Sequence, residues 1–136
     1  MLLSFSIDEM RPMIVNGLKE LAGEPVDGRV KRQTIRRFGP QYMKKFGTAK
    51  HLEGLQLDLW WKGRTPNRFK FGQVTGSGTL LKLERTAENH ILVTGFEPLP
   101  ELVELSVKDG FNTVDEFLDY FVPNNGDVFE GVLFRW

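Results

Sequence analysis

The chain has 136 residues, of which 40% are hydrophobic and 26% charged, and its 18 basic residues match its 18 acidic ones, so its formal net charge is zero. This length and composition suit one folded domain over residues 1–136 and exclude a disordered chain. The absence of cysteine excludes disulfides and thiolate chemistry. Because the apolar start is too short for a signal peptide and no apolar run approaches the ~20 residues of a membrane span, we expect a soluble cytoplasmic protein with no membrane partner.

The beginning of the chain predicts a strand and then a helix. Residues 2–6 form a short apolar run that is typical of a strand. Apolar side chains then recur at helical spacing over residues 10–18, and Ser6 or Asp8 can cap this helix. We expect Asn16-Gly17 to weaken the helix near its end and residues 21–28 to form a loop.

A strongly basic segment follows this loop. Residues 28–50 contain eight basic side chains and no acidic one. Residues 28–70 hold twelve basic residues against two acidic ones, whereas residues 71–136 hold four against eleven. A neutral chain with one positive segment is suited to an anionic partner, and phosphate is the first candidate. The eight side chains are Arg29, Lys31, Arg32, Arg36, Arg37, Lys44, Lys45 and Lys50.

The middle of the chain predicts a short helical turn over residues 40–46 and a strand over residues 55–61, where apolar and polar side chains alternate. Trp60 lies on the polar face of that strand, where it could stack on a nucleic-acid base or pack under a loop. Residues 62–70 read as a loop that extends the positive stripe through Arg64 and Arg68.

The last part predicts a hairpin, two helices and a closing strand. Residues 71–85 and 91–96 pair across a turn at residues 87–89, and Gly76-Ser77-Gly78 indicates a bulge or a close backbone approach more than a phosphate loop. A short helix is expected over residues 101–106. Thr113 caps the next helix, with Glu116 closing a capping box. Residues 128–136 form the last strand.

The motif Lys31-x-x-Thr34-x-Arg36 places an ammonium, a hydroxyl and a guanidinium within six residues. A desolvated lysine can activate a hydroxyl nucleophile, and the same groups can bind a phosphate or a base edge. On a regular strand Lys31 and Thr34 face opposite sides, so a turn near Arg32-Gln33 is needed to bring them together. The alternative is a solvated basic strand edge without further function.

Other polar residues suggest no separate site. His51 and His90 are far apart and lack metal-ligand spacing, so surface histidine is the better interpretation of both. Asp109 reads as a turn residue before the capped helix. We therefore expect no metal and no cofactor, and the sequence leaves the oligomeric state open.

The ordered motifs resemble a known family. Lys31-x-x-Thr34-x-Arg36 resembles the signature of ASCH domains, relatives of the PUA RNA-binding fold. Residues 54–57 are similar to the family strand after the basic segment, residues 109–117 to its "DGF" turn and capped helix, and residues 129–136 to the closing strand of phage and prophage members. The resemblance implies an α+β fold: a small mixed PUA-like β-barrel of about five or six strands with flanking short helices.

The resemblance also implies an activity. A bacterial branch of the family acts as an acetylcytidine amidohydrolase with a threonine nucleophile, an assisting lysine and a glutamate, and another member is reported as a ribonuclease. Carried over, Thr34 would attack the amide carbon and Lys31 would activate it. The carboxylate falls near Asp109, where aspartate stands in place of glutamate.

Three functions follow as expectations. The first is binding of RNA, single-stranded nucleic acid or a nucleotide in a basic cleft. The second is hydrolysis by an acetylcytidine amidohydrolase-like or ribonuclease activity through Lys31, Thr34 and Asp109. The third is a partner-binding role for the acidic helix with Asp115, Glu116 and Asp119, which a solvated helix face explains more simply. We expect Lys31 and Thr34 to share the cleft and leave contact with Asp109 open. The expected nucleic-acid contacts are Arg29, Lys31, Arg32, Arg36, Arg37, Arg64, Arg68 and Trp60.

Overall fold

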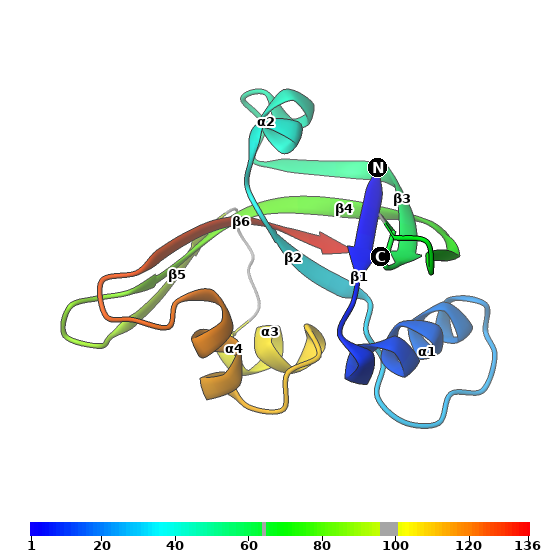
Figure 1. Cartoon of the computed structure of the whole chain (residues 1–136). Coiled ribbons are helices and arrows are strands. Elements are labelled where there is room, and N and C mark those ends of the chain that lie inside the picture. The colour runs from blue at the N-terminus through cyan, green and yellow to red at the C-terminus, as the bar shows by residue number, and fades with distance from the viewer. Residues whose placement is uncertain (64, 96–100) are drawn as a thin grey trace.

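The structure, a computed structural model, describes residues 1–63, 65–95 and 101–136, which form a curled six-stranded sheet flanked by short helices (Figure 1). The strand order is β1-β3-β4-β6-β2, and β5 pairs with β4. The strands are β1 (Leu2–Phe5), β2 (Gln33–Arg37), β3 (His51–Trp61), β4 (Phe69–Arg85), β5 (Ile91–Gly95) and β6 (Val128–Arg135). The helices are η1 (Asp8–Met10, a 3₁₀ turn), α1 (Arg11–Leu21), α2 (Pro40–Phe46), α3 (Leu102–Lys108) and α4 (Val114–Phe121).

The sheet forms a half-barrel and does not close through backbone hydrogen bonds. Strand β1 runs parallel to β3, and the other pairs are antiparallel. The long β4 pairs with β3 through its first part and with β5 and β6 through its second. The edge strands β1 and β2 share no ladder, but the Arg36 guanidinium donates a hydrogen bond of 2.6 Å to the Ser4 carbonyl across the seam between them. The α+β class and the curled sheet with short helices are confirmed, whereas the expected barrel closure is not observed.

Strand β6 separates two hydrophobic cores because its side chains alternate between its faces. Val132 and Phe134 pack in the first core with residues of β1, β3 and α2. Leu133 packs in the second core with Ile35 of β2 and the buried faces of α3 and α4. Burial on both faces makes β6 and its neighbour β2 rigid supports for the seam.

The start of α1 differs from the prediction. Neither Ser6 nor Asp8 caps the helix, because residues 8–10 form the 3₁₀ turn and α1 begins at Arg11 without a side-chain cap. The helix also continues through Gly17. A Cβ atom at Gly17 would collide with the Lys31 carbonyl oxygen, so this glycine allows the chain before β2 to lie directly on the helix.

The Asn16 side chain of α1 hydrogen-bonds to the loop that follows the helix. Its side-chain amide donates hydrogen bonds of 3.0 Å to the carbonyl oxygens of Asp27 and Arg29. The Lys31 amide then donates to the Met13 carbonyl oxygen at 2.9 Å. Asn16 and Gly17 together position the residues that lead into β2.

The central strands are longer than predicted. Strand β3 begins at His51, and a register irregularity between Leu52 and Leu55 accommodates Gly54, whose φ of 68° suits glycine. Strand β4 begins at Phe69. A Cβ atom at Gly76 would collide with the Arg135 carbonyl oxygen, which confirms the close backbone approach. The hairpin joining β4 and β5 is also confirmed.

The two C-terminal helices are joined by a tight turn. Helix α3 runs two residues beyond its predicted end, and Gly110 follows with a φ of 103°. The Thr113 hydroxyl accepts a hydrogen bond of 3.1 Å from the Glu116 amide, which confirms the cap. The Glu116 carboxylate accepts from the Asn112 amide, one residue before the donor of a standard capping box. No helix in residues 1–63, 65–95 or 101–136 is long and apolar enough to cross a membrane.

Candidate functional site

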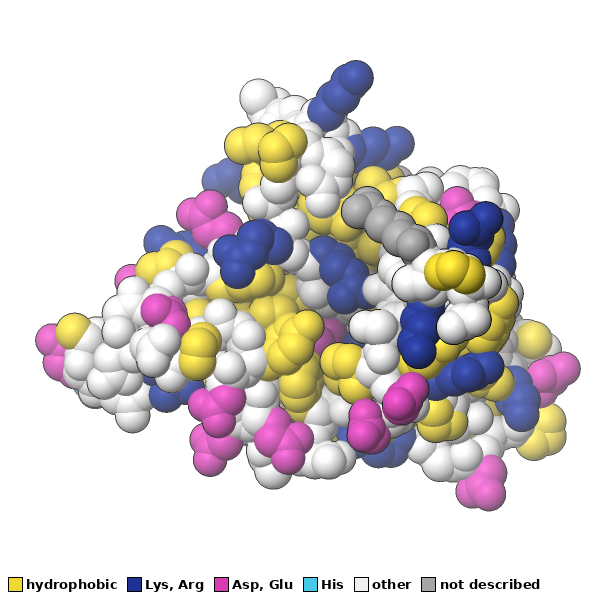
Figure 2. All heavy atoms as spheres, in the orientation of Figure 1, with side chains coloured by type: hydrophobic (Ala, Val, Ile, Leu, Met, Phe, Trp, Pro, Cys, Tyr) yellow, Lys and Arg dark blue, Asp and Glu magenta, His cyan; other side chains and the backbone are white. Residues whose placement is uncertain are grey.

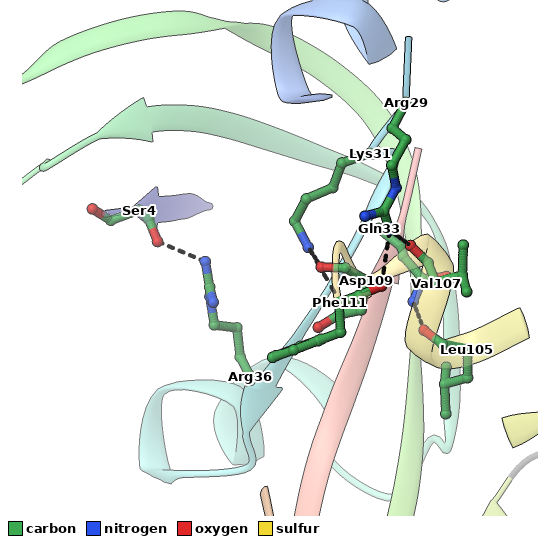
Figure 3. Close-up of polar contacts among 9 residues, drawn as sticks. All are labelled: Ser4, Arg29, Lys31, Gln33, Arg36, Leu105, Val107, Asp109 and Phe111. Atoms are coloured by element: carbon green, nitrogen blue, oxygen red, sulfur yellow. Dashed lines mark hydrogen bonds and ion pairs between the residues drawn. The ribbon is translucent and has the colours of Figure 1, made fainter. Parts of the chain in front are cut away.

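A cavity of about 70 Å³ lies at the seam where β1, β2 and the turn after α3 meet. A cavity needs roughly 10–15 Å³ to hold one water, so this one accepts several waters or one small chemical group but not a whole nucleotide. Figure 3 shows Lys31 and Asp109 pointing toward one another and Arg36 reaching to Ser4. The lining includes Lys31, Thr34, Arg36, Asp109, Phe111 and Tyr120.

Lys31 is buried although it belongs to the most basic part of the chain. Only 1% of its surface is exposed, so a solvated strand edge is the wrong interpretation of this residue. It precedes β2, so the alternation of a regular strand does not apply to it. Its ammonium donates to the Asp109 carbonyl oxygen and lies 3.5 Å from Asp109 Oδ1. Lys31 and Thr34 line the same cavity, as predicted, and Asp109 joins them.

Asp109 follows α3 and is 4% exposed. Its Oδ1 has no hydrogen-bond partner among the described residues, although the Lys31 ammonium is within ion-pair distance. A buried acceptor without a hydrogen bond costs about 1–3 kcal/mol. The site therefore contains a buried carboxylate oxygen whose hydrogen-bonding capacity is unused among the described residues.

Burial shifts both members of this ion pair toward their neutral forms. Desolvation is the largest cause for Lys31 and, opposed by Asp109 and reinforced by Arg36, lowers its pKa to about 8. Desolvation likewise raises the pKa of the Asp109 carboxyl, against the effect of Lys31. Strongly perturbed ionisable groups in a cavity are typical of functional sites.

Thr34 supplies a free hydroxyl. The residue is 2% exposed, and no described residue hydrogen-bonds to its hydroxyl, including the Lys31 ammonium. Its neighbour on the same face of β2 is Arg36, two residues later. Burial lowers the pKa of the Arg36 guanidinium, which nevertheless stays charged at neutral pH.

The cavity continues into a shallower hollow of about 610 Å³. The two share Ser4, Ser6 and Arg36, and Lys62 and Thr65 line the outer part. The cleft thus has an inner cavity and an outer hollow with Arg36 at their junction. Figure 2 shows this face, with Lys and Arg side chains over its centre and upper part and Asp and Glu side chains along its lower edge.

Two of the residues predicted to contact nucleic acid use their guanidinium groups for hydrogen bonds to other parts of the protein. The Arg29 guanidinium donates to the carbonyl oxygens of Val107 and Phe111 at 2.9 Å (Figure 3). It also donates to the Asn112 side chain at 2.8 Å. It thereby secures the turn that carries Asp109. Arg32 donates from Nε to the Trp136 carbonyl at 2.8 Å and pairs with Glu20 at 2.9 Å.

The other predicted contacts are dispersed. Arg37 is exposed, with its guanidinium 4.9 Å from the centre of the Phe129 ring. Arg68 is exposed, and Trp60 is half-buried in β3 and lines neither the cavity nor the hollow. Arg64 lies outside the described residues. The basic segment is therefore not one continuous surface.

Sequence reasoning missed Tyr120 at the rim of the cavity. This residue of α4 is 62% exposed, and its ring centre lies 5.5 Å from that of Phe111. Its place outside the apolar stripe of the helix was the available signal. His51 hydrogen-bonds to Thr79 and Glu53, and the described residues contain no group of three or more possible metal ligands.

Comparison with known proteins identifies no family. A scan against family models and searches of curated proteins and of solved structures found no match for this chain. The similarity to ASCH domains therefore stays a prediction that depends on the motifs themselves.

Proposed function

We propose that the chain is an ASCH-type, PUA-like protein whose cleft binds a nucleotide, free or within RNA or another single-stranded nucleic acid. The motifs behind the resemblance support this proposal because they are far apart in the sequence and meet at one place. The three named residues of Lys31-x-x-Thr34-x-Arg36 line the same cavity as Asp109 and Phe111 of the "DGF" turn.

The observation that carries the proposal is the buried Oδ1 of Asp109, which is paired with the Lys31 ammonium but accepts no hydrogen bond from the described residues. Together with the Thr34 hydroxyl and the Lys31 ammonium, this oxygen forms a small group of hydrogen-bond donors and acceptors in the cavity lining. Such a group is complementary to the edge of a nucleobase, which carries donors and acceptors side by side. The cavity volume of about 70 Å³ suits the edge of a base while the rest of the nucleotide stays outside.

Tyr120 would support the base. An exposed aromatic ring at the mouth of the cavity offers a stacking face, and stacking contributes ~1–3 kcal/mol per base. The cations Arg36 and Lys62 near the same mouth favour a ligand with phosphate.

A titration of labelled single-stranded RNA at several salt concentrations tests this function. Log affinity is expected to fall with log salt by ~0.7 per phosphate neutralised. Thr34→Val, which removes only the free hydroxyl, is expected to weaken binding about fivefold, the effect of ~1 kcal/mol. Lys44→Gln, a matched change on the exposed face of α2, should have a smaller effect. Absence of binding at low salt, or equal losses in both variants, would count against the proposal.

Amide hydrolysis of a modified nucleoside is the second candidate. It is favoured by the lowered pKa of Lys31, about 8, beside a free threonine hydroxyl. Thr34 Oγ1 would add to the amide carbon while its proton passes to the neutral Lys31 amine. The carbon–nitrogen bond would then break as the leaving nitrogen takes that proton, and water would hydrolyse the resulting ester to the acid. Asp109 would hold the Lys31 ammonium in place.

Mass-spectrometric detection of acetate released from acetylated cytidine tests this second candidate. Because the neutral amine is the base, the rate should rise about tenfold per pH unit below pH 8 and level off above it. Thr34→Ala should abolish turnover, and Lys44→Gln should not. Binding without turnover would leave the cleft a binding site, and shortening of the RNA on a gel would indicate a ribonuclease instead.

A further inference from the structure

The outer hollow beside Arg36 contains a second cation, Lys62. Lys62 directly follows β3 and has a φ of 47°, which non-glycine residues rarely adopt. Its amide donates to the Phe5 carbonyl at 2.8 Å, and its carbonyl accepts from the Thr65 amide at 3.0 Å and the Thr65 hydroxyl at 2.9 Å. These bonds hold the strained residue in place, and such strain is concentrated at functional sites.

The charge of Lys62 is not neutralised by the protein. No carboxylate of the described residues lies within ion-pair distance of its ammonium, whose recorded side-chain contact is the Trp61 ring, with the ring centre 5.6 Å away. By contrast, the Lys70 ammonium pairs with Asp58 at 2.8 Å. An ammonium without a carboxylate partner, carried by a held backbone position beside a hollow, is suited to an anion.

Arg36 reaches the same hollow from β2 with most of its donors unused. One guanidinium nitrogen donates to the Ser4 carbonyl, and the guanidinium carbon lies 4.9 Å from the centre of the Phe5 ring. A guanidinium has five N–H donors in a planar fork, so this bond orients the group and leaves others for a ligand. Arg36 and Lys62 therefore approach the hollow from two different elements.

We propose that the outer hollow is a phosphate-binding subsite in which Arg36 and Lys62 bind the phosphate of a nucleotide whose base edge enters the inner cavity. The inference rests on the proposed function and deepens it: the ligand class is a nucleoside monophosphate or a single nucleotide unit of a strand. Phosphate fits because the arginine fork binds two of its oxygens and a lysine adds a point charge. Binding along the whole basic segment is disfavoured because Arg29 and Arg32 are already bonded within the protein.

Calorimetric titration with a nucleoside, its 5′-monophosphate and its 3′-monophosphate tests the subsite. The wild-type protein is expected to bind one of the monophosphates at least about tenfold more tightly than the nucleoside, as a charge-assisted hydrogen bond would give. Lys62→Gln should reduce this preference to below about threefold and leave nucleoside binding unchanged. Lys44→Gln removes one exposed charge outside both parts of the cleft and should retain the preference.

A second variant of Lys62 distinguishes a loss of phosphate binding from a loss of stability. Lys62→Gly relieves the positive φ, so it should unfold at the same or a higher denaturant concentration than the wild type while losing the phosphate preference. Equal affinities of wild type for nucleoside and monophosphates, or a preference retained in both Lys62 variants, would overturn the subsite and leave the base site standing. Failure to bind any of the three ligands would overturn the subsite, and absence of RNA binding as well would overturn the proposed function with it.

Discussion

Replacement of Lys31 by methionine provides a quantitative test of its burial. Burial lowers the pKa of Lys31 from 10.5 to about 8 in the folded protein. Between these values the unfolded chain binds a proton that the folded protein has released, so stability rises with pH in this window. A shift of one pKa unit corresponds to ~1.4 kcal/mol, which gives a total of about 3 kcal/mol.

The assay is urea denaturation of wild type and Lys31→Met at several pH values from 7 to 10. The wild type should gain stability relative to the variant by ~1.4 kcal/mol per pH unit above about pH 8. Titrating groups far from Lys31 cancel in the difference, whereas Asp109 contributes to it because burial raises the pKa of its carboxyl and Lys31 opposes that rise. Lys44→Met, which removes an exposed ammonium on α2, is the matched control for the substitution itself. A difference between wild type and Lys31→Met that does not vary with pH would refute the claim that a charged lysine is held in a desolvated cavity.

Three further predictions concern the elements that position the site. Gly17→Ala should lower the free energy of unfolding by ~1–3 kcal/mol in urea denaturation, because its Cβ would collide with the Lys31 carbonyl; a neutral effect would contradict the close packing. Arg29→Gln should lower the free energy of unfolding by ~1–3 kcal/mol in the same assay, because its hydrogen bonds to the turn are lost. It should change the salt dependence of RNA binding less than Arg36→Gln does. A larger change in salt dependence for Arg29→Gln would show that Arg29 contacts the ligand. Thr113→Ala should cost about 1 kcal/mol, and Thr113→Ser should restore most of it; equal losses would show that the cap hydrogen bond does not stabilise α4.

Periodicity and capping rules predicted most elements because they depend on neighbouring residues. The apolar spacing and the Thr113 cap located α4, and the turn residues located the hairpin between β4 and β5. These rules fail where a segment distant in the sequence determines the local structure. Local rules treat Gly17 as a residue that weakens the helix, whereas in the fold it makes room for the Lys31 carbonyl.

The site was predictable as a set of residues but not as a geometry. The motif indicated that Lys31 and Thr34 belong together, and the turn around Asp109 was recognised through the resemblance. Charge counting could not show that Lys31 is buried while Arg29 holds a turn, because both are simply basic residues in a basic segment. Lys62 stood out neither by pattern nor by motif, since a positive φ is visible only in the folded chain.

Mapping of amide chemical shifts during titration with a nucleoside monophosphate tests the central claim most directly. The account predicts the largest shifts at the seam, in residues 4–6, 34–36 and 109–111, with further changes at Tyr120 and Lys62. The exposed lysines of α2 should shift little at moderate salt. Shifts confined to those lysines, or spread evenly over the basic residues without the seam, would contradict the claim that the cleft between β1, β2 and the turn after α3 is the binding site.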